Sequence, residues 1–224
     1  ENTIDSVPVE ENFRTNIIGN FFTDHVTINL VVMENFNEPD YLVEAATAEE
    51  INAALKAGYD VVFKGDVVAP SEESNGYGKT AISQTNGGTI DGNGNTLSAP
   101  GSTGTWDSAI NTSGGTIKNI KVTKGFRGIF IKNSSHNEKL YLDNVTIEGT
   151  TYTISCDQGN GLGLEATNST FKGWTSYAAT LGNAKFTDCY FGYGNGYSYC
   201  RPYAPTEFVG CEFEAGLRLD PRAA

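Results

Sequence analysis

A repeat is the feature of this 224-residue sequence that most limits the folds it can adopt. Six segments share a pattern in which a small polar residue or glycine, here called the register residue, is followed three positions later by an apolar or aromatic residue. The register residues are Gly94, Asn119, Asn144, Asn168, Asp188 and Gly210. Subtraction of neighbouring positions gives spacings of 25, 25, 24, 20 and 22. A period of this length in a β-rich sequence predicts a solenoid with stacked coils.

Apolar residues hold fixed places relative to the register residues, as the interior of a solenoid requires. Two positions before the register are Ile117, Leu142, Ala166, Phe186 and Phe208. One position after it are Ile120, Val145, Ser169, Cys189 and Cys211, and three positions after it are Val122, Ile147, Phe171, Phe191 and Phe213. Neighbouring coils lie about 4.8 Å apart, so equivalent residues stack on one another. We therefore expect these side chains to point inward.

The register column itself is mostly Asn and Asp. These residues, like glycine, favour tight bends in the backbone. We expect the column to form a polar ladder at a bend, with the side-chain amides bonded to the backbone of the next coil.

Composition and charge exclude several classes of protein. Residues that favour strands and turns dominate, with 26 glycines and 11 tyrosines, which favours an all-β fold. The net charge of -12 argues against a nucleic-acid partner, because phosphates require a basic surface. No apolar run approaches the roughly 20 residues of a membrane helix, so we expect no membrane span.

A single helix is predicted ahead of the repeat. Thr47 and Glu50 have the spacing of a capping box, and Gly58 provides a stop signal. The spacing predicts a helix over residues 48–57, followed by strands at 61–63 and 67–68. We divide the chain into a β-segment with a linker, residues 1–40, and a solenoid domain of about six or seven coils, residues 41–224.

The segment from Gly88 to Leu97 resembles the opening coil of right-handed parallel β-helix proteins of the pectate-lyase-like superfamily. The helix expected over 48–57 is similar to the amphipathic cap that these proteins place over the N-terminal end of the core. The resemblance implies a right-handed parallel β-helix solenoid with an N-terminal helical cap. It implies little about activity, because one fold hosts many functions.

The segment from Val7 to Asn20 resembles part of the end of fimbrillin-like domains. Such domains occur in surface lipoproteins and pilus-related proteins of gut Bacteroidales. The resemblance implies an adhesin of that group that is exported and located at the cell surface or outside the cell.

Four cysteines are present, and none belongs to a Cys-x-x-Cys pair. Cys189 and Cys211 occupy the same inward position one coil apart. The alternatives are a disulfide and a stacked pair of buried thiols, and we favour the thiols because the Cβ vectors of stacked strands run parallel. Cys156 and Cys200 stay unassigned.

We expect neither a metal site nor a cofactor. His25 and His136 are far apart in the sequence and lack neighbouring ligand patterns. The glycine-rich turn that starts at Asp91 lacks the spaced carboxylates and final glutamate of a calcium loop.

Catalysis is the less favoured class of function. Outward positions two after the register are Thr96, Lys121, Thr146, Thr170, Tyr190 and Glu212. Lys121 and Glu212 are four coils apart, about 19 Å, so they cannot act on one bond. Asp143 and Glu165 come nearest to the carboxylate pair that a glycoside hydrolase needs, and we interpret them as surface acids.

Aromatic and arginine side chains form the candidate ligand-binding residues, and a glycan or a surface protein is the expected partner. They are Tyr193, Tyr197, Tyr199, Arg201, Tyr203, Trp174, Tyr177 and Arg127. The same segments also contain Phe126, Tyr152 and Arg218. The competing interpretation is that these aromatics clamp the loop over residues 192–205 onto the last coils.

We therefore expect a non-catalytic, adhesin-like protein of the cell surface that contacts glycans or host proteins. The alternatives are a carbohydrate-active enzyme, either a polysaccharide lyase or a glycoside hydrolase, and a structural spacer.

Overall fold

A computed structural model gives the fold of the chain. It describes residues 42–69, 79–99, 107–132, 139–156, 162–177, 181–194, 196 and 198–218, and the backbone of three short strands outside those ranges. Contacts divide the chain into two units, Glu1–Tyr41 and Leu42–Ala224. In the first unit, β1 (Arg14–Ile18) pairs antiparallel with β2 (Asn29–Met33).

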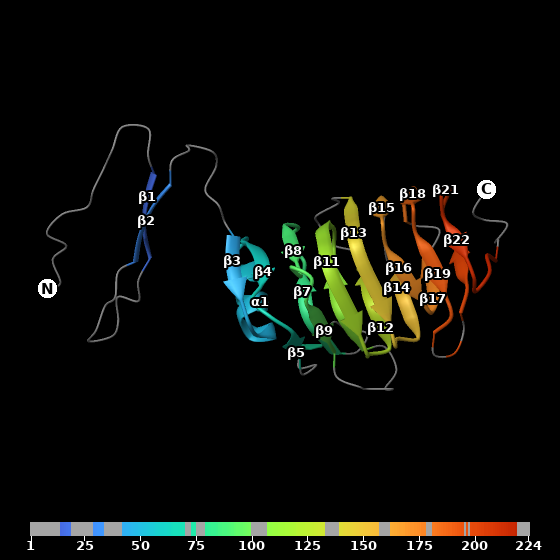
Figure 1. The fold of residues 1–224 in the computed structure, drawn as a ribbon, viewed down its shortest axis with the longest axis horizontal. Helices are drawn as coiled ribbons and strands as arrows, with labels where there is room; N and C mark the ends of the chain where they lie inside the picture. Colours follow the sequence, from blue (N-terminus) through green and yellow to red (C-terminus); the bar gives the residue numbers. More distant parts are fainter. Residues whose placement is uncertain are drawn as a thin grey trace, which may run out of the picture. The chain divides into compact units, whose positions relative to one another are not determined.

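The second unit is an all-β parallel solenoid of about five turns (Figure 1). The sequence predicted six or seven coils. The difference arises because six register residues enclose only five intervals, and each interval is one turn. The predicted parallel solenoid is confirmed.

A seven-stranded sheet forms the first wall of the solenoid. Its strands are β6 (Glu73–Ser74), β7 (Lys79–Gln84), β10 (Ser108–Thr112), β12 (Arg127–Ile131), β14 (Tyr152–Cys156), β17 (Trp174–Tyr177) and β20 (Cys200–Pro202). All neighbours in this wall are parallel except β6 and β7.

A 13-stranded parallel sheet forms the second and third walls. The second wall contains β3 (Leu42–Ala45), β4 (Asp60–Phe63), β8 (Thr89–Asp91), β15 (Leu164–Thr167), β18 (Ala184–Thr187) and β21 (Thr206–Val209). The third contains β5 (Val67–Val68), β9 (Thr96–Ser98), β16 (Thr170–Lys172), β19 (Tyr190–Gly192) and β22 (Glu212–Phe213). The long strands β11 (Gly115–Thr123) and β13 (Leu140–Glu148) run through both walls.

The register residues form the corner between the second and third walls. Asn119, Asn144, Asn168 and Asp188 have φ angles of 50°, 53°, 50° and 53°, and Gly210 has 63°. Short polar side chains and glycine tolerate this left-handed conformation better than other residues do. The predicted bend is therefore confirmed.

The amides of this corner bond mainly to side chains of the neighbouring coil. Asn144 Nδ2 donates to Asn119 Oδ1 at 3.0 Å, and Asn119 Nδ2 donates to Asp91 Oδ1 at 3.2 Å. Asn168 Nδ2 reaches Asp143 Oδ1 at 3.4 Å. The expectation that these amides bond to the backbone was wrong, because the backbone groups at the corner already bond between coils, as Gly94 N does to Asn119 O at 2.8 Å.

The expected inward residues fill the core, with one systematic exception. Those of the coils up to Phe191 are buried, whereas Phe208, Cys211 and Phe213 of the last coil are half-buried. Equivalent rings stack between the last two coils: Phe191 lies 4.9 Å from Phe213 with an interplanar angle of 4°. The exception follows from position, because no described strand covers the far side of the last coil.

The first complete coil has a longer corner than the others. Ile90 pairs with Ile117, and Leu97 pairs with Val122. The segment from Ile90 to Leu97 is nevertheless two positions longer than the segment from Ile117 to Val122. The extra positions form the turn after Asp91. Glycine is required in this turn, because a Cβ on Gly92 would lie 2.5 Å from Ile120 Cβ.

Helix α1 (Ala48–Lys56) packs on β7, β4 and β3 at the N-terminal end of the solenoid (Figure 1). The predicted capping box is present: Glu50 N donates to Thr47 Oγ1 at 3.2 Å, and Thr47 N donates to the Glu50 carboxylate. The helix buries Ala48, Ile51, Ala54 and Leu55. The Asn52 side chain fastens it to β7 through 2.8 Å bonds to Ala81 O and Ser83 N.

None of the four cysteines, all within the described ranges, forms a disulfide. Cys189 is buried and donates to Thr187 O at 3.3 Å, and burial is the main cause that raises its thiol pKa to about 11. Burial also raises the pKa of Cys200. These thiols stay protonated at neutral pH and act as small core residues. Cys211 is only half-buried, contrary to the expectation of two buried thiols.

No helix among the described residues has the length and apolar character needed to cross a membrane.

Candidate functional site

Several of the predicted binding residues lie in one column of paired positions that runs along the first wall. Arg127 pairs with Tyr152, and Tyr152 pairs with Trp174 in the next strand. Tyr199 comes directly before Cys200, which pairs with Thr175, and it therefore continues the column. The parallel register thus brings together side chains that are one repeat apart in the sequence.

Four of these side chains form what we call the aromatic ladder: Phe126, Tyr152, Trp174 and Tyr199. The ring centroids are 5.3 Å, 4.4 Å and 5.4 Å apart along this series. Tyr152 and Trp174 are nearly parallel, at 21°. All four side chains are half-buried. The central rings therefore cover each other's faces and turn mainly their edges outward.

Two arginines lie against tyrosine rings near the C-terminal end of the ladder. The Arg201 guanidinium carbon is 4.5 Å from the Tyr203 ring centroid, and that of Arg218 is 5.7 Å from Tyr199. Arg218 is exposed, and Tyr193, in the loop between β19 and β20, has 63% of its surface exposed. We call Tyr199, Arg201, Tyr203 and Arg218 the Arg–Tyr surface.

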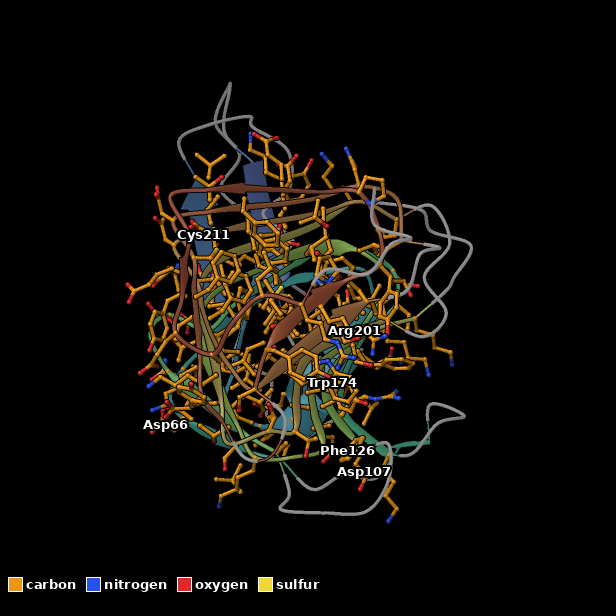
Figure 2. The ribbon with its side chains drawn as sticks, turned by 90° about the vertical axis from the view of Figure 1, so that its right-hand side faces the viewer. Asp66, Asp107, Phe126, Trp174, Arg201 and Cys211 are labelled. Carbon is orange, nitrogen blue, oxygen red and sulfur yellow. The ribbon has the colours of Figure 1, made fainter. Side chains whose placement is uncertain are left out.

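The view along the solenoid separates this side from the corner between the second and third walls. Figure 2 shows Phe126, Trp174 and Arg201 toward one side of the cross-section and Asp66 and Cys211 toward the other. The ladder and the register corner are therefore different faces of the same coils.

The structure removes two predicted residues from the candidate surface. Tyr177 is 1% exposed and its hydroxyl bonds to Thr206 Oγ1 at 2.8 Å, while burial raises its pKa. Arg127 is 0% exposed, with its guanidinium carbon 4.3 Å from the Phe130 ring centroid. Tyr177 points inward because it follows the inward Thr175 by two residues. Arg127 lies in a strand whose residues are all buried.

The remaining predicted residues have accessible surface or lie outside the described ranges. Trp174, Tyr199, Arg201 and Tyr203 are half-buried, and Tyr193 is exposed. Tyr197 lies outside the described residues.

Sequence reasoning placed Phe126, Tyr152 and Arg218 in the right segments but did not include them in the site. Tyr152 was recognisable, since it stands one repeat spacing after Arg127 and one repeat spacing before Trp174. Arg218 had no such signal, because its contact with Tyr199 depends on how the chain continues after β22.

Several carboxylates on the outer faces of the second and third walls are paired with lysines. The predicted outward column from Thr96 to Glu212 is confirmed by the strand register. Lys121, however, pairs with Glu148 at 2.6 Å, and Lys172 approaches the same carboxylate at 3.5 Å. The hydrogen bond from Lys121 is the main cause that lowers the pKa of Glu148. Glu148 is therefore ionised at neutral pH and is a poor proton donor.

Asp143 and Glu165 lie in different columns. Asp143 faces Lys118 and Thr167, whereas Glu165 faces Tyr141 and Lys185 and also pairs with Lys139. Among the paired strands of the described ranges, no two carboxylates face each other in register. The nearest candidate for an acid pair thus does not have the geometry of one.

A separate hollow of about 460 Å³ lies on the outer side of the second wall. Its lining residues are Asp60, Gly88, Thr89, Gly115, Thr116, Lys139 and Tyr141. The Tyr141 ring is its aromatic wall, with Lys139 Nζ 5.7 Å from the ring centroid. Within the described part of the chain, no group of three or more His, Cys, Asp or Glu side chains is arranged to hold a metal ion.

Comparison with models of protein families, with curated proteins and with solved structures finds no match for this chain. The functional interpretation therefore depends on the geometry of the surfaces described above.

Proposed function

We propose that the protein is a non-catalytic, adhesin-like solenoid that binds glycans through the Arg–Tyr surface and the adjoining edge of the aromatic ladder. The observation that carries this proposal is the placement of two arginines on tyrosine rings beside a row of half-exposed aromatic side chains.

The chemistry of this surface suits a sugar ligand. Tyrosine combines an apolar ring with a hydroxyl group, and such side chains contact both the C–H faces and the hydroxyl groups of sugars. Arginine donates paired hydrogen bonds to carboxylates and sulfates. Because the chain carries a net charge of -12, two arginines on one surface locally offset the repulsion of an acidic sugar.

The ladder geometry limits how a sugar can bind. Tyr152 and Trp174 are 4.4 Å apart and nearly parallel, so a sugar ring cannot stack between them. Contact is left to the ring edges and to the exposed Tyr193. The ligand therefore runs along the ladder or lies against the Arg–Tyr surface.

The location and origin of the protein belong to the same proposal. The resemblance of Val7–Asn20 to fimbrillin-like domains of gut Bacteroidales supports export to the cell surface. A host or partner protein is the other ligand class that such an adhesin takes.

Two competing functions make different predictions. A carbohydrate-active enzyme needs a pair of carboxylates, or a base beside an acidic site, whereas Glu148 and Glu165 are paired with lysines and Asp143 accepts a hydrogen bond from Thr167. A spacer needs only the stack of coils and no ligand at all.

A glycan array of neutral, uronic-acid and sulfated oligosaccharides tests the proposal. We expect wild-type protein to bind, and the variant Tyr199→Ala/Arg201→Ala/Arg218→Ala to lose at least tenfold in signal. Tyr141→Ala is the matched control, because it removes an exposed tyrosine in the separate hollow. Circular dichroism and thermal melting verify that each variant is folded.

Each other outcome of the array has a definite meaning. Loss of binding by Tyr141→Ala alone assigns the ligand to the hollow of the second wall. Equal signals from wild type and the triple variant remove the Arg–Tyr surface from consideration. No binding by folded wild-type protein favours the spacer, and release of shorter sugars from a bound oligosaccharide favours the enzyme.

A further inference from the structure

We propose that the last coil is a docking edge for an extended basic strand of another protein, which adds to the solenoid in parallel register. This is β-strand addition, in which backbone hydrogen bonds give affinity and alternate side chains give specificity. The inference is independent of glycan binding, because it uses a different part of the last coil.

The first observation is an edge of the last coil that pairs with no further strand of the described ranges. β21 pairs with β18 and β22 with β19, and no other strand of the described ranges pairs with either (Figure 1). Such an edge presents backbone donors and acceptors to another chain.

The second observation is incomplete burial of core side chains at this edge. Phe208, Cys211 and Phe213 are half-buried, whereas the equivalent residues one coil earlier, Phe186, Cys189 and Phe191, are at most 2% exposed. Val209 beside them is 42% exposed. One more strand on each wall would complete the burial of these side chains.

The opposite end of the solenoid is partly covered by a helix, although β3 pairs only with β4 among the described strands. Helix α1 lies there and buries Ile51 and Leu55 against the core. The two ends therefore differ, because a helix packs on the first strands and no described helix packs on the last coil.

Charge identifies the partner. One outward column runs from Glu165 to Lys185 to Glu207, and Lys185 pairs with Glu207 at 3.3 Å. If the alternation continues, a strand that pairs with β21 carries a lysine or arginine opposite Glu207. Glu212 and Glu214, also exposed on the last coil, add further negative charge.

A second copy of the chain fits this edge less well. Its outermost strand at the other end, β3, would place Leu42 opposite Glu207 if the solenoids stacked end to end in register. The exposed carboxylate of Glu44 lies two residues further along the same strand. Acidic groups at both ends and the net charge of -12 oppose such stacking.

The register specifies the sequence of the docking strand. It carries a basic residue at the level of Glu207, an aromatic or branched apolar residue at the level of Phe208, and Asn, Asp or Gly at the level of Gly210. An aromatic residue at the level of Phe213 completes the pattern. The coil before the last carries residues of these types at the same levels, namely Lys185, Phe186, Asp188 and Phe191.

The test uses a peptide with this pattern, made from residues 184–191 of the chain with Asp188→Asn and Cys189→Ser. It is titrated into the ¹⁵N-labelled 224-residue chain while amide chemical shifts and hydrogen exchange are recorded. We expect shifts and slower exchange confined to residues 206–213 and their neighbours. A peptide with Lys185→Glu in addition is expected to bind at least threefold more weakly.

Charge reversal on the protein separates a specific edge from general attraction. We expect Glu207→Lys to weaken the binding of the basic peptide and to restore the binding of the Lys185→Glu peptide. Glu44→Lys is the matched control, since that glutamate is similarly exposed and paired with a lysine at the other end, and it is expected to change neither. Equal binding of the two peptides, or shifts outside the last coil, would overturn the proposal. Concentration-dependent dimers in sedimentation that are abolished by Glu207→Lys would assign the edge to a second copy instead.

Discussion

At the scale of single residues, the corner between the second and third walls depends on side chains that tolerate positive φ. Asn119, Asn144, Asn168 and Asp188 supply them in successive coils. The repeat made the bend predictable, because Asn, Asp and Gly recur at one register position. It did not reveal which atoms the amides bond to, since that depends on which backbone groups the stacked coils already use.

Asn144→Val tests the backbone requirement at this corner. Valine is strained at the φ of 53° found there, whereas glycine is not, and both lose the hydrogen bond to Asn119. We expect Asn144→Val to lower the free energy of unfolding by about 1–2 kcal/mol more than Asn144→Gly does. Urea unfolding measures the difference. Thr146→Val, two residues further along the same strand, is the control, and an equally large loss there would contradict the explanation.

Glu148 gives a prediction for pH. The hydrogen bond from Lys121 lowers its pKa from 4.5, so the carboxylate stabilises the fold above that pH, and the contribution is lost as pH falls through the lowered pKa. We expect Glu148→Gln to lower the free energy of unfolding by less than about 1 kcal/mol at pH 7, since the partly exposed pair of Glu148 and Lys121 is screened by water. The cost should vanish below the lowered pKa. Urea unfolding at pH 7, 5 and 3 measures it, and a cost that grows on acidification would show the opposite sign.

At the scale of elements, strand alternation was the most reliable guide from the sequence, and it was not applied to the aromatic residues. Alternation within β17 shows that Trp174 faces outward and Tyr177 inward. Arg127 is different, because every residue of β12 is buried and alternation alone does not predict that. The candidate site was therefore recoverable from sequence for Tyr152 and Trp174, but not for Arg127 or Arg218.

Helix α1 begins at a capping box that local sequence specified completely. Thr47→Ala removes the oxygen that accepts from Glu50 N, and we expect a loss of about 1 kcal/mol in the free energy of unfolding. Thr47→Ser keeps an oxygen at this position and should lose little. Hydrogen exchange in α1, compared with that in β13, shows whether the effect stays within the cap. Unchanged exchange in the Ala variant would mean that packing on β7 alone holds the helix.

At the scale of the whole molecule, the solenoid is a stack in which each coil contacts only its neighbours. The spacing of the register residues predicted this architecture and the core positions of the second and third walls, but not those of the first wall, such as Ile110, Ile129 and Ile154. It did not predict that Phe208, Cys211 and Phe213 would be half-buried, since burial at an end depends on what covers that end. Stability in such a stack is approximately a sum over coils and their interfaces, so whole coils are separable units.

Removal of one complete coil tests this view. Deletion of residues 144–167 joins Asp143 to Asn168 and keeps the register, because Asn144 and Asn168 hold equivalent positions in successive coils. We expect a folded solenoid that is shorter by about 4.8 Å and less stable than wild type. Circular dichroism, urea unfolding and small-angle scattering measure these properties. Deletion of residues 144–166 is the matched control, because a shift of one residue turns inward side chains outward and should prevent folding. Folding of both deletions to the same extent would show that the register of this coil is not what holds the stack together.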